Sequence, residues 1–166
     1  MTARRFAAPA IFALLVLATI AAFAYAQRLK REPLILDKVT FNPLIAGRAV
    51  ITPNGDRRTE FVHIRFRLTK SDRGIVDVID SDGRPVKTFK VKIISRKGRV
   101  TARIPPGGEL EAFKDFALRW NGHTDDGRVA PTGPYHLRVR LLGQDRTLIP
   151  AGRIRVHDLN RVQGSG

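Results

Sequence analysis

The aspartates before Asp82-Gly83 are the first residues in this sequence that could do chemistry. Asp77, Asp80 and Asp82 place three carboxylates at short spacing, as a calcium-binding loop does. Such a loop also needs oxygen ligands at alternating positions and a later bidentate glutamate, and the sequence lacks both the full spacing and that glutamate. Aspartate-glycine between two apolar runs is a strong β-hairpin signal, because a tight turn needs positive φ. We favour the hairpin over calcium binding.

His123, Asp125 and Asp126 form a second cluster of potential ligands within one short segment. Three neighbouring residues could contact a metal ion, but they supply no distant fourth ligand and no groups to orient the others. We therefore expect a solvated turn and assign no metal ligand.

The remaining histidines, His63, His136 and His157, are scattered along the chain at positions expected to face outward. A catalytic histidine requires a nucleophile and an orienting acid within reach. The sequence has no nucleophile elbow and no phosphate-binding Gly-Lys-Ser/Thr motif. It also has no cysteine, which excludes disulfides, cysteine-bound metals and a cysteine nucleophile. We expect no enzyme activity, no catalytic or cofactor-binding residue, and no cofactor.

Basic residues dominate the charge of the chain. Thirty lysines and arginines stand against 15 aspartates and glutamates in 166 residues, a formal net charge of +15. Such an excess attracts polyanions, whether nucleic acid, anionic lipid headgroups or acidic wall polymers. The alternative is a soluble basic surface without a binding role. The outward positions carry no row of aromatic side chains for base stacking, which argues against nucleic acid as the partner.

The elements that must carry these residues are predicted to be β-strands, because apolar and polar residues alternate with period two. The alternation is clearest at 61–68 and 135–141, and it recurs at 89–93, 99–104 and 153–155. Glycine-containing turn signals separate the runs and favour an antiparallel sandwich or barrel. These signals are Asn54-Gly55, Asp82-Gly83, Lys97-Gly98, Asn121-Gly122, Asp126-Gly127 and Thr132-Gly133. One helical turn is expected at 110–116.

A buried core follows from the same alternation. Trp120, the single tryptophan, is expected to fill the core with its indole hydrogen-bonded, and Tyr135 to bond its hydroxyl to the backbone at a corner of the sandwich. The predicted core comprises Val62, Ile64, Phe66, Val76, Val78, Trp120, Tyr135, Leu137 and Val139.

An N-terminal apolar segment precedes this domain. Residues 6–26 carry no charge, and as a helix they would reach about 31 Å, which matches the ~30 Å core of a bilayer. Arg4 and Arg5 precede the segment, and Ala24-Tyr25-Ala26 resembles a signal-peptide cleavage site. The length favours an uncleaved transmembrane anchor, and a signal peptide cleaved after Ala26 is the alternative.

Five motifs in the domain occur in an order that resembles a known family. They are Pro53-Asn54-Gly55-Asp56, Val78–Phe89 with its Asp82-Gly83, Trp120-Asn121-Gly122, Asp125–Arg128, and Pro131–Tyr135. Together they resemble the FlgD-type immunoglobulin-like domain of the flagellar hook-capping protein and related modules of bacterial surface proteins. The resemblance covers residues 50–157 and implies a sandwich of seven to eight strands without an active site. Residues 105–119 are longer than the corresponding connection in that family. No hook-binding region precedes the domain, so the flagellar role does not carry over.

The sequence thus predicts an all-β, antiparallel immunoglobulin-like β-sandwich behind a single membrane segment. Its predicted parts are a basic start at 1–5, the membrane segment at 6–26, a linker at 27–34, the sandwich at 35–157 and a tail at 158–166. The expected function is a non-catalytic module of the bacterial cell envelope, outside the cytoplasm, that interacts with an envelope protein or an anionic envelope polymer. A basic surface protein that holds anionic lipid or wall polymer is the alternative.

Overall fold

The computed structural model describes residues 12, 14–23, 25, 35–55 and 59–157. The chain divides into two compact units, Met1–Leu34 and Ile35–Gly166. Residues 14–23 of the first unit are helical, but no helix among the described residues is long and apolar enough to cross a membrane. Several expectations lie outside the described residues: the basic start at 1–5, parts of the segment 6–26, the linker 27–34, Asp56 and the tail 158–166.

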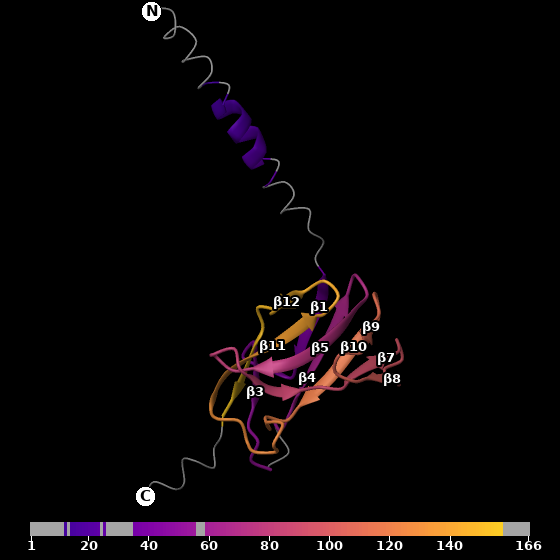
Figure 1. The fold of residues 1–166 in the computed structure, drawn as a ribbon. Coiled ribbons are helices and arrows are strands. Elements are labelled where there is room, and N and C mark those ends of the chain that lie inside the picture. The colour runs from indigo at the N-terminus through magenta and orange to yellow at the C-terminus, as the bar shows by residue number, and fades with distance from the viewer. Residues whose placement is uncertain (1–11, 13, 24, 26–34, 56–58, 158–166) are drawn as a thin grey trace, which may run out of the picture. The chain divides into compact units, whose positions relative to one another are not determined.

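The described part of the second unit is built from strands that form two sheets (Figure 1). Sheet A has the order β1-β4-β10-β7-β8, and sheet B has the order β2-β3-β13-β11-β5-β6, with β12 beside β11 and β9 beside β5. The strands are β1 (Leu36–Asn42), β2 (Leu44–Ile45), β3 (Arg48–Ile51), β4 (Val62–Leu68), β5 (Asp72–Ile79), β6 (Pro85–Thr88), β7 (Val91–Ile94), β8 (Val100–Ile104), β9 (Glu109–Leu110), β10 (Asp115–Trp120), β11 (Gly133–Leu141), β12 (Arg146–Leu148) and β13 (Arg153–Val156).

The two sheets enclose one apolar core, a β-sandwich-like arrangement. Alternate residues of β4 and β10 in sheet A and of β5 and β11 in sheet B belong to a single buried cluster. All nine residues of the predicted core are buried, which confirms the period-two interpretation. The Trp120 Nε1–H donates to the carbonyl of His123 at 2.8 Å, and the Tyr135 hydroxyl donates to the carbonyl of Pro131 at 2.6 Å. Both hydrogen bonds match the expectation for these rings.

The structure also corrects several sequence-based expectations. The described residues form thirteen strands rather than seven or eight, partly because strands of two or three residues, β2, β9 and β12, are too short to show alternation. One pairing, β3 with β13, is parallel rather than antiparallel. The helical turn expected at 110–116 is wrong: Leu110 ends β9, a loop follows at 111–114, and Asp115 begins β10. Gly133 begins β11 and does not have the positive φ of the other predicted turn glycines.

The strand register gives the sandwich two distinct ends. At the first, called the Ile35 end, the chain enters β1, and the loops 69–71, 111–114 and 142–145 lie here because Leu36 pairs with Leu68 and Leu141 with Gly74. At the opposite end, called the Gly122 end, β13 finishes beside the start of β11. The loops 80–84 and 121–132 belong to the Gly122 end.

Candidate anion-binding face

Cationic side chains gather on the outer face of sheet A. Strand pairing aligns Arg65 of β4 with Ala117 of β10, then Lys92 of β7 and Arg103 of β8. Neighbouring strands lie about 4.8 Å apart, so this row spans roughly 14 Å across the sheet. The next row adds His63 and Arg119, which are also paired. We call this surface the basic face, and it consists of His63, Arg65, Lys90, Lys92, Arg103 and Arg119.

Carboxylates do not neutralise the basic face. Within the described residues, none of Arg65, Lys90, Lys92, Arg103 and Arg119 forms an ion pair. Like charges held side by side on a sheet repel one another, and an anionic ligand would relieve that repulsion.

An acid does lie at the border of this surface. Arg67 of the adjacent strand donates two hydrogen bonds to Asp115 at this border. Its Nε lies 3.0 Å and its Nη2 2.5 Å from Asp115 Oδ1. Asp115 is therefore already paired, and it leaves the charge of the neighbouring row uncompensated.

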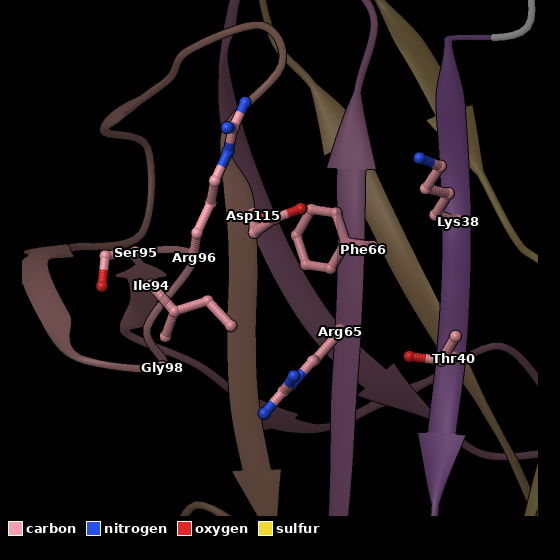
Figure 2. Close-up of a pocket in the computed structure, with 9 residues that line it drawn as sticks. All are labelled: Lys38, Thr40, Arg65, Phe66, Ile94, Ser95, Arg96, Gly98 and Asp115. Atoms are coloured by element: carbon pink, nitrogen blue, oxygen red, sulfur yellow. The ribbon is translucent and has the colours of Figure 1, made fainter.

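Two hollows lie on this side of sheet A, one on each side of the row through Ala117. The first has a volume of about 270 Å³ and is lined by residues of β1, β4, β10 and the β7–β8 turn, including Lys38, Arg65 and Arg96 (Figure 2). The second, about 470 Å³, includes His63, Lys92 and Arg119 in its lining. Ala117, which lines the second hollow, carries only a methyl group between longer cationic side chains. Anionic groups could approach the sheet at this point.

His63 is held in a cationic and partly aromatic environment. Its ring meets that of Phe61 edge-on, with centroids 5.1 Å apart, and the guanidinium of Arg119 stacks 4.6 Å from the centroid of the same Phe61 ring. Burial lowers the pKa of His63 from its ordinary value. The charges of Arg119, Arg65 and Lys92 lower it further. A bound anion would oppose these repulsions, so anion binding and protonation of His63 should favour each other.

The outer face of sheet B has a different electrostatic arrangement. The buried carboxylate of Asp77 accepts hydrogen bonds from Arg138, at 2.8 Å from Nε and 2.7 Å from Nη2, and Arg140 lies 3.4 Å from the same carboxylate. Hydrogen bonding to Asp77 raises the pKa of Arg138. Two arginines of β11 are thus bound internally. Arg153 and Arg155 of β13 stay exposed on this sheet.

The three carboxylates first considered as calcium ligands make separate contacts: Asp77 binds Arg138, Asp82 pairs with Arg84, and Asp80 binds the backbone of the turn. Asp80 accepts hydrogen bonds from the N–H groups of Asp82 and Arg84, each at 2.9 Å. Gly83 has φ +79°, as the predicted hairpin requires. No group of three or more potential metal ligands occurs among the described residues.

The second predicted cluster, around His123, is also dispersed over separate contacts. Asp125 pairs with Lys87 at 3.1 Å and accepts from the Thr88 N–H at 3.0 Å. Asp126 is bound by Thr124 and Arg128, and these hydrogen bonds lower its pKa to about 2. The carbonyl of His123 accepts a hydrogen bond from the indole N–H of Trp120. The His123 ring contacts the Asn121 carbonyl, Asp125 contacts β6 and Asp126 contacts its own turn, so the three side chains have different partners.

Comparisons with known proteins place few constraints on the chain. No family model matches it. C5a peptidases of Streptococcus pyogenes, from serotype M18 strain MGAS8232 and from serotype M1, are 28% identical over 95 residues, which is 55% of this chain and 8% of their own length. The chain therefore spans less than a tenth of these curated relatives. A solved structure of Pseudomonas fluorescens alkylpurine DNA glycosylase AlkC, bound to DNA containing an abasic site analog, overlaps 72% of this chain and 30% of its own with TM-score 0.31 and 12% identity. A similarity this weak carries no argument.

Proposed function

We propose that this chain is a non-catalytic module of the bacterial cell envelope that binds an anionic polymer through the basic face of sheet A. The observation that carries the proposal is the contrast between the row through Ala117 in sheet A and strand β11 in sheet B. In sheet B, Asp77 binds the cations of β11 internally, whereas the cations in the row through Ala117 have no carboxylate partner among the described residues. Charge left unpaired on one regular surface favours a ligand with repeated negative charges.

We further propose that the domain is of the FlgD-type immunoglobulin-like class and is held outside the cytoplasm by an anchor at residues 6–26. The five motifs and their order along the sequence support this class of domain, and the uncharged N-terminal segment supports the anchor. The matched C5a peptidases share only 8% of their length with the chain, so we do not extend the activity in their name to it. A phosphatase reporter fused after Gly166 should be active, and an inactive, stably made fusion would contradict this orientation.

The test of polymer binding uses the full chain in zwitterionic nanodiscs and inorganic polyphosphate as the probe. The double variant R65E/R119E reverses two charges on the basic face. R153E/R155E reverses two exposed charges on sheet B and is the matched control, because both variants have the same net charge. We expect an affinity loss of about tenfold or more for the first variant and a small loss for the control, since screening limits exposed charges to a range of about 8 Å at physiological salt.

The outcomes discriminate between surfaces. Equal losses in the two variants would show that only net charge matters and would contradict a defined face. A larger loss in R153E/R155E would move the site to the hollow lined by Arg48, Arg153 and Arg155. Repeating the titration with nanodiscs that contain phosphatidylglycerol separates a lipid headgroup from a free polymer as the source of the phosphate.

A further inference from the structure

Two large apolar side chains project from the Ile35 end of the sandwich. Phe113 is 70% exposed and Leu142 is 41% exposed. They lie on separate loops: Phe113 precedes β10 of sheet A, and Leu142 follows β11 of sheet B. An isolated exposed apolar residue is common and needs no explanation. Here two of them occupy the same end.

Both loops are fixed by hydrogen bonds. The N–H of Phe113 donates to the carbonyl of Leu68 at 2.7 Å, although its φ of +60° is unfavourable for a residue with a side chain. The preceding Ala112 N–H donates to the Ser71 hydroxyl at 2.8 Å. The structure therefore stabilises a costly backbone conformation that leaves an aromatic ring in solvent.

The loop of Leu142 is fixed in a similar way. The Leu142 N–H donates to the carbonyl of Arg73 at 2.8 Å. The buried carboxylate of Asp72 accepts hydrogen bonds from the N–H groups of Gly143 at 2.8 Å and Gln144 at 3.0 Å. A carboxylate satisfied by several donors is a strong constraint on a short loop. Leu142 is thus presented at a defined position.

The chain enters the sandwich at this same end. The carbonyl of Ile35 accepts a hydrogen bond from Thr69 N–H at 2.9 Å, which places the first residue of the domain beside the loop 69–71. Residues 27–34 connect it to the apolar segment 6–26. The nine Cα–Cα steps from Ala26 to Ile35 span at most about 32 Å when fully extended. Any bilayer that contains the segment 6–26 must therefore lie within that distance of Ile35.

We propose that the Ile35 end is a membrane-contacting surface, with the side chains of Phe113 and Leu142 inserted at the boundary between lipid headgroups and acyl chains. This inference rests on the proposed anchor. Lys70 and Arg73 are exposed at the same end, but so are Glu109 and Glu111, so the contact does not depend on anionic lipid. Aromatic and aliphatic side chains enter this boundary by about 5–10 Å in proteins that lie on a bilayer. The anchor makes two side chains sufficient, because it keeps the domain at high local concentration near the membrane.

The test places a tryptophan in the surface and measures its contact with lipid. The full chain is reconstituted in vesicles of phosphatidylcholine, with and without chains brominated close to the headgroup. Variants F113W and L142W each add one indole to the Ile35 end, and R84W adds one at the Gly122 end, where the Arg84 side chain is 78% exposed. Wild type supplies the baseline, because the ring of Trp120 is fully buried.

We expect bromolipid to remove about half or more of the added emission of F113W and L142W, and to leave R84W unchanged relative to wild type. Flotation of the same samples tests the anchor separately. If the chain does not float with the vesicles, the anchor and the contact both fail. If it floats and neither F113W nor L142W is quenched, the contact alone fails. Shielding of these indoles from acrylamide without quenching by bromolipid would show that another protein surface covers this end and would also overturn the proposal.

Discussion

The indole of Trp120 meets the ring of Tyr135 edge-on, with centroids 5.2 Å apart and planes at 70°. Trp120 ends β10 of sheet A, and Tyr135 lies near the start of β11 of sheet B. The contact therefore joins the two sheets at the Gly122 end. Both polar groups of the pair are satisfied by carbonyls of the connecting loop, so this corner combines apolar packing with complete hydrogen bonding.

Removing this indole should strongly destabilise the domain. Trp120→Ala leaves a large cavity at a site of 0% exposure, and such changes cost about 3–5 kcal/mol. Chemical denaturation followed by circular dichroism measures the loss, with Trp120→Phe as the control that keeps an aromatic ring. A wild-type free energy of unfolding in Trp120→Ala would show that the ring does not lie in the core.

Two glycines at positive φ allow backbone strain to be separated from packing. Gly83 has φ +79° and no atom within 4 Å of an added Cβ, whereas Gly122 has φ +76° and its Cβ would lie 3.2 Å from the side chain of Ile51. We expect Gly83→Ala to cost about 1 kcal/mol from the backbone alone and Gly122→Ala about 2–3 kcal/mol, because the contact adds to the strain. Both variants keep Trp120, so its emission reports unfolding. Equal losses would mean that Ile51 moves aside freely.

Asp77 binds Arg138 and Arg140 of β11, and its replacement has two expected effects. Asp77→Asn should lower the free energy of unfolding by about 2–3 kcal/mol, less than the ~3–5 kcal/mol for a fully buried pair because Arg140 is partly exposed. It should also strengthen polyphosphate binding to sheet B, because Arg138 and Arg140 lose their internal partner. Comparison of R65E/R119E with and without Asp77→Asn measures the gain. No recovery of binding would indicate that these arginines stay inaccessible.

The pH dependence of the chain provides a test of His63. Its pKa is lowered in the folded protein, so the unfolded chain takes up a proton first as pH falls, and without ligand His63 should make the fold less stable below about pH 6.5. Polyphosphate binding should instead tighten from pH 7 to pH 5, as the protonated ring adds charge to the basic face. In His63→Gln both slopes should be smaller. An unchanged pH dependence of affinity would exclude His63 from the binding surface.

Much of the strand pattern could be predicted from the sequence, because burial on one face of a sheet forces alternation. Val62, Ile64 and Phe66 alternate with polar residues, and this local pattern is enough to predict that they share the buried face of the strand. The turn at Asp82-Gly83 was also predictable from local sequence, because the turn requires a positive φ and glycine adopts it at little cost. In contrast, β9 has two residues and owes its conformation to β5, which is distant in sequence. The local sequence pattern therefore does not predict such a pairing.

The sequence predicts which residues of the candidate site are cationic, but not that they lie together on one surface. Arg65 and Arg103 both alternate with apolar residues, but they are 38 positions apart, and no local pattern shows that they share a row. That row depends on the register of β4, β10, β7 and β8. The internal binding of Arg138 by Asp77 was equally hidden, although it separates the cations of β11 from the unpaired cations of sheet A. In the sequence alone, the basic strands of the two sheets show the same alternation of cationic and apolar residues.

The opposite positions of the first and last strands have a mechanical consequence. A tension applied between Ile35 and His157 would run along the strands, because β1 enters at one end and β13 leaves at the other. Antiparallel ladders hold their hydrogen bonds perpendicular to the strands, so this pull would shear the bonds of β1 with β4 and of β13 with β11 together rather than open them one by one. A domain tethered at its N-terminus and pulled from its far end would thus resist extension.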